Sequence, residues 1–334
     1  MQAIEVHDPS QVAEARRAAV ALARAHAFGE EDSGRVAIVA SEIATNLVKH
    51  GGGGELLIGS YDDRTGAGIE LLSLDKGRGM ADISASARDG HSTAGSSGNG
   101  LGAIRRGAHM SDIYSLPDRG TAILARLQPG QPDRGRTTEM PDYGTVSVAM
   151  YGEEVCGDGW CRHAVDDGLL LMVTDGLGHG PSAAEASHAA SRSFYRTLGS
   201  APSAALTAMH GELRPTRGAA VAVARIEPAE QRIVYAGVGN IAGTIVGADG
   251  TVQRMVSNNG TVGHIAKHIR DFVYPLKPGS LVILASDGLG TSWRLDHYPG
   301  IANHHPTLIA GVLYRDFTRG RDDVTVLVAR TGSA

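Results

Sequence analysis

Apolar side chains recur at three- and four-residue intervals near the start of the chain, and this spacing predicts two amphipathic helices. The first helix begins after Asp8, whose side chain can cap it, and extends to about Phe28. Asp32 or Ser33 is expected to cap the second helix. The apolar stripe of the second helix consists of Val36, Val39, Ile43 and Leu47.

Short apolar runs bounded by turn residues predict strands in the rest of the chain. In the first half these runs cover 55–61, 69–74 and 122–127. In the second half they cover 146–151, 168–174, 219–226, 232–238, 244–246, 280–286 and 324–329, with a helix from Pro181 to about Leu198. Helices beside an antiparallel sheet predict an α+β layer in the first half. The excess of strands predicts a two-sheet sandwich with flanking helices in the second half.

A stretch with almost no apolar residues separates these two parts. Residues 128–141 read QPGQPDRGRTTEMP, with three prolines, two glycines and mixed charge, which is the composition of a linker. The chain length of 334 residues also suits two domains. We therefore predict a first domain over 1–128, a linker over 129–141 and a second domain over 142–334.

Composition narrows the class of protein. The net charge of −5 argues against a broad nucleic-acid footprint. No apolar run is long enough to span a bilayer, and the stretch from Met1 to Ser10 lacks the apolar segment of a signal peptide. Cys156 and Cys161 have no further ligands at zinc-site spacing, so they are interpreted as reduced thiols. We expect a soluble, cytoplasmic protein with neither a nucleic-acid nor a membrane partner.

Polar residues of the first half suit a bound nucleotide. Glu42 and Asn46 lie four residues apart and share one stripe of the second helix. An asparagine oxygen can hold Mg²⁺ that also binds phosphates, and a nearby glutamate can orient or deprotonate an attacking hydroxyl. Asp75 follows a predicted strand, where its carboxylate can accept from an exocyclic amine. Each feature alone also has an ordinary explanation, because such pairs are common on solvated helix faces and such aspartates are common in turns.

Glycines accompany these polar residues. Gly77 and Gly79 follow Asp75, and a second glycine group opens another predicted helix, where backbone amides suit phosphate. Thr121 stands just before the last strand of this half. The second glycine group consists of Gly98, Gly100 and Gly102, with Leu101 between the last two.

The order of these groups resembles the GHKL family of ATPases and kinases. SEIATNLVKHGGGG, LDKGRGM and SGNGLGAIRR are similar to the N, G1 and G2 boxes of that family, and most similar to those of anti-sigma-factor Ser/Thr kinases. The resemblance implies a GHKL-type α/β sandwich that binds ATP with Mg²⁺. It also implies that Asn46 is the Mg²⁺ ligand, Glu42 the candidate catalytic base and Asp75 the adenine reader, in a pocket shaped by the glycines.

Aspartates dominate the chemistry of the second half. Asp175 and Asp287 each follow an apolar strand and precede a glycine, and Asp158 also precedes a glycine. The pair Asp322 and Asp323 precedes the last strand. A single Asp-Gly pair usually marks a hairpin turn. Carboxylates that meet at one sheet edge, however, would repel one another unless cations lay between them, and oxygen ligands favour Mg²⁺ or Mn²⁺.

The flanking residues resemble the SpoIIE-like branch of the metal-dependent type 2C protein phosphatases, through the segments GDGW, TDGLGHG, SDGLG and RDDVTVLV. The resemblance implies an α/β/β/α sandwich with two Mn²⁺ or Mg²⁺ ions. It implies Asp158, Asp175, Asp287 and the Gly176 carbonyl as metal ligands, together with Asp322 or alternatively Asp323. The arginine that grips substrate phosphate in classical members has no clear counterpart.

These resemblances together imply a phosphoprotein Ser/Thr phosphatase fused to a kinase-like ATP-binding domain. The implied substrate is a STAS-type anti-sigma antagonist or stressosome protein, which a bifunctional version would also phosphorylate. One alternative is an N-terminal module that binds nucleotide or a sigma factor without turnover and gates the phosphatase. Another is a second half that has become a structural relic with too few metals. The sequence leaves a homodimer open.

Overall fold

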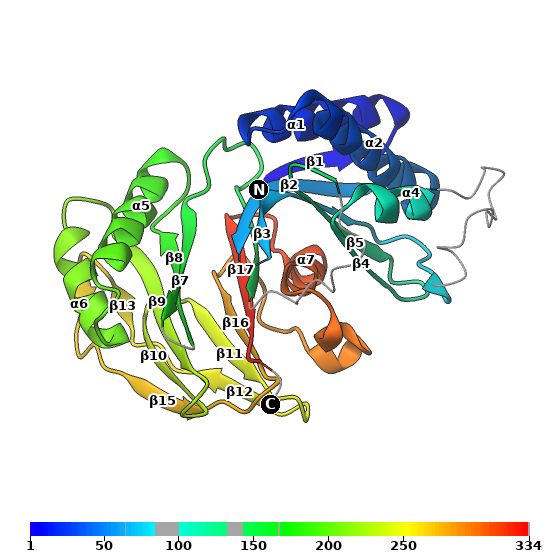
Figure 1. Ribbon diagram of the computed structural model, residues 1–334. Coiled ribbons are helices and arrows are strands. Elements are labelled where there is room, and N and C mark those ends of the chain that lie inside the picture. The colour runs from blue at the N-terminus through cyan, green and yellow to red at the C-terminus, as the bar shows by residue number, and fades with distance from the viewer. Residues whose placement is uncertain (64, 84–99, 132–142, 166–167, 333–334) are drawn as a thin grey trace. The chain divides into compact units, whose positions relative to one another are not determined.

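The structure of the protein is a computed structural model that describes residues 1–63, 65–83, 100–131, 143–165 and 168–332 (Figure 1). The chain forms two compact units. The first contains Met1–Pro141 and Asn303–Arg315, and the second contains Asp142–Ala302 and Asp316–Ala334. The predicted two-domain α+β architecture is confirmed. The segment Asn303–Arg315, however, belongs to the first unit, although the sequence places it within the second domain. Most of the predicted linker lies outside the described residues.

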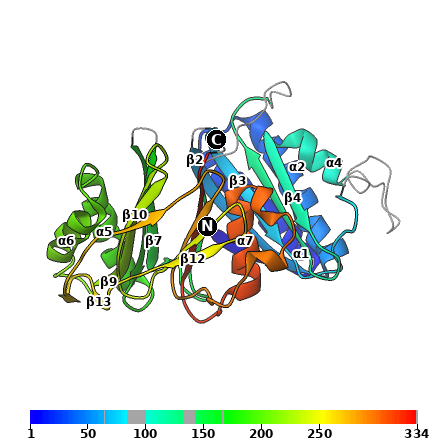
Figure 2. The same ribbon diagram turned by 90° about the horizontal axis from the view of Figure 1, so that it is seen from below.

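The first unit is a five-stranded antiparallel sheet with the strand order β1-β2-β3-β5-β4 (Figures 1 and 2). Three α-helices cover one face of this sheet, and α7 covers the other (Figures 1 and 2). The strands are β1 (Gln2–Val6), β2 (Gly54–Asp63), β3 (Gly66–Leu74), β4 (Met110–Ser115) and β5 (Thr121–Leu127). The helices are α1 (Pro9–Ala25), α2 (Glu30–Asn46), the π-helical η1 (Leu47–Gly51), α4 (Gly100–Gly107) and α7 (Pro306–Phe317).

The two long helices begin in different ways. Asp8 caps α1 through the backbone N–H of Ser10, and the side chain of Gln11 accepts from the backbone of Asp8, so the predicted start is confirmed. The predicted cap of α2 is wrong, because this helix begins at Glu30 after an uncapped glycine. Asp32 lies inside the helix, in its first turn, where it forms an ion pair with Arg35 at 3.0 Å.

Side-chain alternation along β3 explains why both faces of the sheet are covered. Leu71 packs with the core under the helices, whereas Leu72 and Leu74 point to the face that carries α7. A Cβ added to Gly311 of α7 would lie 2.5 Å from Leu72 Cδ2, so the helix approaches the sheet closely at this glycine. Every residue of α7 up to Arg315 is buried.

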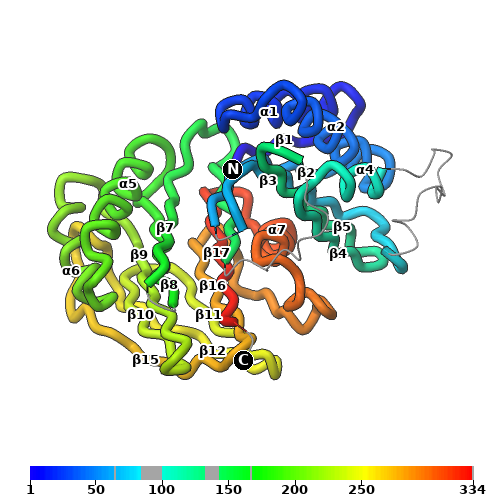
Figure 3. Tube along the Cα trace, viewed as in Figure 1, coloured from blue at the N-terminus to red at the C-terminus, as the bar shows by residue number. Residues whose placement is uncertain are grey.

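The second unit contains two five-stranded antiparallel sheets, ordered β15-β10-β9-β8-β7 and β12-β11-β16-β17-β6. Their facing side chains form one core, and α5 and α6 pack on the outer face of the first sheet (Figure 3). The strands of the first sheet are β7 (Asp158–Val165), β8 (Gly168–Gly176), β9 (Ala219–Glu227), β10 (Arg232–Val238) and β15 (Phe272–Pro275). Those of the second are β6 (Tyr143–Val148), β11 (Ala242–Val246), β12 (Val252–Met255), β16 (Leu281–Ala285) and β17 (Val324–Arg330).

The remaining elements are two helices, a two-stranded pair and two 3-10 turns. The helices α5 (Pro181–Arg196) and α6 (Pro202–Glu212) lie between β8 and β9 in sequence, and β13 (Gly260–Thr261) pairs with β14 (Ile265–Ala266). The 3-10 turns η2 (Leu295–His297) and η3 (Ile301–Asn303) precede α7. Within the described ranges, no helix is both long and apolar enough to cross a membrane.

Candidate nucleotide pocket and metal centre

The predicted Glu–Asn pair lies against the start of α4. A Cβ added to Gly100 would lie 3.2 Å from Glu42 Oε2 and 3.3 Å from Asn46 Oδ1. A side chain at this position would therefore be in tight contact with both Glu42 and Asn46. The Asn46 Nδ2 atom is buried and has no hydrogen-bond partner among the described residues. A buried polar atom of this kind is available to a ligand.

The Asp75 carboxylate is fixed at the end of β3. Its Oδ1 atom accepts hydrogen bonds from the backbone N–H of Gly77 at 2.8 Å and of Thr121 at 3.1 Å. Burial raises the pKa of Asp75, while these two hydrogen bonds and the charge of Arg315 act in the opposite direction. No described residue donates to Oδ2, so this oxygen can accept from a ligand.

Glycines let the surrounding segments approach this aspartate. A Cβ added to Gly51 would lie 2.8 Å from Asp75 Cβ, and one added to Gly77 would lie 2.7 Å from the Gly51 oxygen. The end of η1 and the Asp75 loop are therefore in direct contact. Gly79 has a positive φ of 62°, and a side chain there would collide with the carbonyl oxygen of Leu116.

The other predicted residues of this pocket lie as follows. The Thr121 hydroxyl is 2.9 Å from the hydroxyl of Ser115, which also accepts from the Met80 backbone. Gly102 is buried in α4, and Leu101 packs against the core beneath the helices. Gly98 lies outside the described residues. The structure thus brings Glu42, Asn46 and Gly100 together at one place, and Asp75, Gly77 and Thr121 at another.

Acidic side chains gather at one edge of the second unit. Asp158, at the start of β7, is paired directly with Asp175, near the end of β8. Burial raises the pKa of Asp158 to about 7, and the charges of Asp323 and Asp322 act in the same direction. Burial raises the pKa of Asp175 to about 8, helped by the charges of Asp158, Asp287 and the 322–323 pair. The predicted aspartates therefore lie near enough to repel one another.

The remaining aspartates have different partners. Asp323 is buried, and its two oxygens accept from the backbone N–H groups of Met150 at 2.8 Å and Gly157 at 2.9 Å. Asp322 accepts from the backbone N–H of Asp323, and one of its oxygens has no described partner. These contacts favour Asp322 over Asp323 as the ligand.

No three acidic, histidine or cysteine side chains of the described residues converge tightly enough to form a ready metal cluster. One aspartate is held by a neighbouring donor instead, because Asp287 Oδ2 accepts a hydrogen bond from Asn240 Nδ2 at 2.6 Å. The donor set still fits a hard cation. Asp158 Oδ2 is buried without a partner in the described part of the chain, and the grouped side chains supply only oxygen. Gly176 lies against the carbonyl of Ala183, where a Cβ would be 2.1 Å from that oxygen.

Two features near this edge were not predicted from the sequence: the contact between His179 and Glu153, and the position of Arg217. His179 Nδ1 and Glu153 Oε1 are 2.6 Å apart, which holds the glycine-rich loop after β8. A Cβ added to Gly178 in that loop would lie 3.1 Å from Arg217 Nη1. Arg217 is exposed, and within the described residues its side chain forms no hydrogen bond or ion pair. Arg217 lies far along the chain from the aspartate motifs. The sequence around it therefore contains no local pattern that predicts its position beside this loop.

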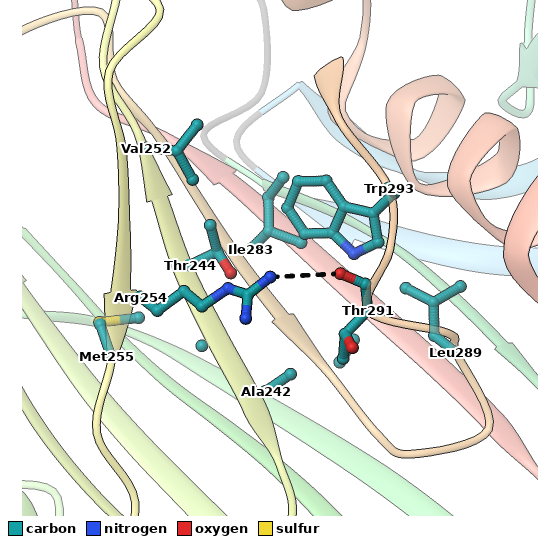
Figure 4. Close-up of a pocket in the computed structure, with 11 residues that line it drawn as sticks. Ala242, Thr244, Val252, Arg254, Met255, Ile283, Leu289, Thr291 and Trp293 are labelled. Atoms are coloured by element: carbon teal, nitrogen blue, oxygen red, sulfur yellow. Dashed lines mark hydrogen bonds between the residues drawn. The ribbon is translucent and has the colours of Figure 1, made fainter. Parts of the chain in front are cut away.

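A cavity of about 210 Å³ lies on the outer side of β11, β12 and β16 (Figure 4). Its wall is mostly apolar, and Arg254 donates to the Thr291 carbonyl at 3.5 Å across it (Figure 4). Ala285 and Leu289, on either side of the Asp287 turn, form part of the wall. The cavity contains none of the predicted site residues.

Comparison with known proteins places these features in a family. Residues 165–332, which make up half of the chain, match stage II sporulation protein E (SpoIIE). The chain belongs to the SpoIIE family. Its residues 6–127 match the histidine kinase-like ATPase domain, so this SpoIIE protein carries both of the domain types that its motifs predict.

Individual relatives agree with this division of the SpoIIE protein. Serine/threonine-protein kinase RsbT of Bacillus subtilis (strain 168) is 33% identical over 104 residues, which cover 31% of this chain and 78% of the relative. A structure from work on the bacterial stressosome, described as a modular system adapted to control secondary messenger signalling, has a TM-score of 0.53. It is 29% identical, and the match covers 57% of this chain and 98% of that one.

A third similar structure is RsbX in complex with magnesium. It has a TM-score of 0.50 and 22% identity, and the match covers 55% of this chain and 92% of that one. At this identity the likeness shows the fold alone. The predicted type 2C phosphatase fold of the SpoIIE region is thereby confirmed.

Proposed function

We propose that this SpoIIE protein is a Mn²⁺- or Mg²⁺-dependent protein Ser/Thr phosphatase that controls the phosphorylation of a STAS-type regulatory protein. The observation that carries the proposal is the direct pairing of Asp158 with Asp175, both with raised pKa, within a type 2C phosphatase fold. Grouped buried carboxylates of this kind are stabilised by bound cations.

The residues of the chain would act in the following way. Asp158, Asp175, Asp287, Asp322 and the Gly176 carbonyl would hold the cations. Such ions supply Lewis acidity and an activated water for attack on a phosphate ester. Asp323 positions the loop before β7, because it accepts from the Gly157 backbone at 2.9 Å. The exposed Arg217 beside the loop after β8 would bind the negatively charged phosphoryl group.

The experiment that tests this function uses a STAS-domain protein phosphorylated on serine or threonine. Incubation with the full chain and Mn²⁺ is expected to release inorganic phosphate, and addition of EDTA is expected to stop the release. A second substrate, p-nitrophenyl phosphate, separates failure of the catalytic centre from the wrong choice of protein. If Mn²⁺ supports turnover of neither compound, the proposed phosphatase activity is rejected.

Arg217→Ala is expected to raise KM for p-nitrophenyl phosphate by about tenfold, because one charge-assisted contact to the phosphate would be lost. The value of kcat should change less, since the metal-binding aspartates stay in place. Steady-state kinetics with Mn²⁺ measure both constants. Arg214→Ala is the matched control, because Arg214 is also exposed and lies in the same segment. Equal KM values for the two variants would remove Arg217 from the phosphate site.

We further propose that the first unit binds ATP with Mg²⁺ and transfers phosphate to the same regulatory protein. This extension is supported by the position of Glu42 and Asn46 beside Gly100 and by the similarity to RsbT, which is named a serine/threonine kinase. Glu42 would orient or deprotonate the attacking hydroxyl, and Asp75 Oδ2 would accept from the amine of adenine. A sigma factor or a homodimer partner would be an additional, separate interaction.

A further inference from the structure

The end of α7 reaches the loop of the candidate adenine reader. Arg315 Nη1 donates a hydrogen bond to the backbone carbonyl oxygen of Asp75 at 2.9 Å, and both residues are buried. The two residues are 240 positions apart in sequence. Arg315 lies inside the region that matches SpoIIE, yet it belongs to the same compact unit as Asp75. A residue of the phosphatase part of the sequence therefore contacts the nucleotide pocket.

The Asp75 carbonyl has little freedom to move once this hydrogen bond is formed. Gly120 has a positive φ of 82°, and a Cβ there would lie only 1.9 Å from the Asp75 oxygen. The Asp75 N–H donates to the Thr121 oxygen at 3.0 Å, and the carboxylate accepts from the Thr121 N–H. The start of β5 and the Arg315 guanidinium thus hold the Asp75 backbone. Burial raises the pKa of Asp75, and the positive charge of Arg315 opposes that rise and so favours the carboxylate form.

Contacts along the whole length of α7 determine where Arg315 lies. Before its first turn, the His305 backbone N–H donates to Asp112 Oδ2 at 2.7 Å. Thr307 Oγ1 accepts from the buried guanidinium of Arg126 at 3.3 Å. In its last turn, the Tyr314 hydroxyl donates to Glu55 Oε1 at 3.1 Å. Each partner belongs to the sheet of the first unit, so α7 is anchored there at several points.

We propose, on the basis of the ATP binding suggested above, that Arg315 is a positioning residue of the nucleotide pocket and that Asn303–Arg315 complete this pocket. Arg315 holds the Asp75 loop in place. In this position Asp75 Oδ2 can accept a hydrogen bond from the amine of adenine and so select adenine. Because binding linkage is reciprocal, bound nucleotide must in turn stabilise the packing of α7 on the sheet.

The test compares ADP and GDP binding to the full-length protein by isothermal titration calorimetry. Arg315→Ala is expected to weaken ADP binding by about tenfold and to leave GDP binding nearly unchanged, so the ADP preference falls. Arg315→Lys keeps the charge and is expected to restore part of that preference. Tyr314→Phe is the matched control, because it removes a neighbouring bond between α7 and the sheet without touching Asp75. Its ADP preference is expected to equal that of the wild type.

Other outcomes contradict specific statements. If the wild type binds neither nucleotide, the proposed ATP binding fails, and this inference fails with it. If the wild type prefers ADP and Arg315→Ala keeps the same preference, only the role of Arg315 is wrong. An equal loss in Tyr314→Phe would reduce Arg315 to a structural residue. If Arg315→Ala does not fold, Arg315→Lys serves as the test. A preference for ADP over GDP below that of the wild type supports the role of Arg315, and an unchanged preference contradicts it. ADP is also expected to slow amide exchange in α7, and unchanged exchange would contradict the linkage.

Discussion

Asp175→Asn is expected to abolish metal-dependent phosphate release and, at the same time, to stabilise the metal-free protein. Asp175 is paired with Asp158 and lies near the other aspartates. Its negative charge therefore destabilises the folded protein unless a cation is bound. Loss of a direct ligand should reduce turnover of p-nitrophenyl phosphate with Mn²⁺ by at least about 100-fold. Asparagine has nearly the same shape and removes the charge without leaving a cavity.

The stabilisation should depend on pH in a defined direction. The pKa of Asp175 is raised from 3.8 to about 8 in the folded protein, so the folded state holds a proton that the unfolded state has lost between these values. The metal-free wild type therefore loses stability as the pH rises through this range. In EDTA at pH 8, Asp175→Asn is expected to have a Tm about 5 °C above the wild type. The difference should shrink toward pH 4.

Thermal unfolding in EDTA across this pH range measures the effect, and the Mn²⁺ assay measures the loss of turnover. Glu230→Gln serves as the control, because it removes an exposed carboxylate in a turn far along the chain from the aspartate motifs. This control should keep the activity of the wild type and its Tm profile. A lower Tm for Asp175→Asn than for the wild type at pH 8 would contradict the mutual repulsion of these carboxylates. Retained turnover would contradict the metal-binding role.

The second large effect is expected from Glu42→Gln in the Asp175→Asn background, which prevents loss of transferred phosphate. Phosphate transfer from radiolabelled ATP to a STAS protein should fall by about 100-fold or more, because glutamine cannot take up the proton of the attacking hydroxyl. ATP affinity should change little, since Glu42 is assigned to the hydroxyl and Asn46 to the Mg²⁺ bound to phosphate. The measurements are label transfer and nucleotide titration on the same preparation.

Glu14→Gln is the control for this variant, because Glu14 is an exposed glutamate on α1 of the same unit. Label transfer by Glu14→Gln should match that of the Asp175→Asn parent. Transfer that is equally fast in Glu42→Gln would show that Glu42 is not the base. If the parent binds ATP but labels none of the STAS proteins, the proposed kinase activity is rejected, and the alternative of a nucleotide-binding module without turnover is favoured.

Local signals in the sequence were sufficient for much of the architecture. The capping residues Asp8 and Gln11 act through neighbouring backbone groups, so the start of α1 could be predicted. Long apolar runs such as Leu281–Ala285 become buried strands in any packed sheet, and β16 was predicted for that reason. The motifs also determined the two domain types, because each combines several residue types at close spacing.

Weak or shared signals explain the errors and omissions. Asp32 and Ser33 are good capping residues, but the extended conformation of Gly29 allowed α2 to start earlier. The strands β1 and β4 are short and partly polar, and the alanine-rich α6 has little amphipathic contrast, so none of them was predicted. The sequence favoured Asp322 as the metal ligand and kept Asp323 as the alternative. The backbone partners of Asp323 distinguish them, and those partners come from distant loops.

The sequence by itself determined the two domain types of this SpoIIE protein, and its motifs supplied most of the residues proposed for the two sites. Only the tertiary structure decided that α7 packs on the sheet of the first unit, that Arg315 contacts Asp75 and that Arg217 lies beside the loop after β8. The physical reason is the range of the interactions. Periodicity and capping act over a few residues, whereas these contacts join residues far apart along the chain and depend on which buried faces come together.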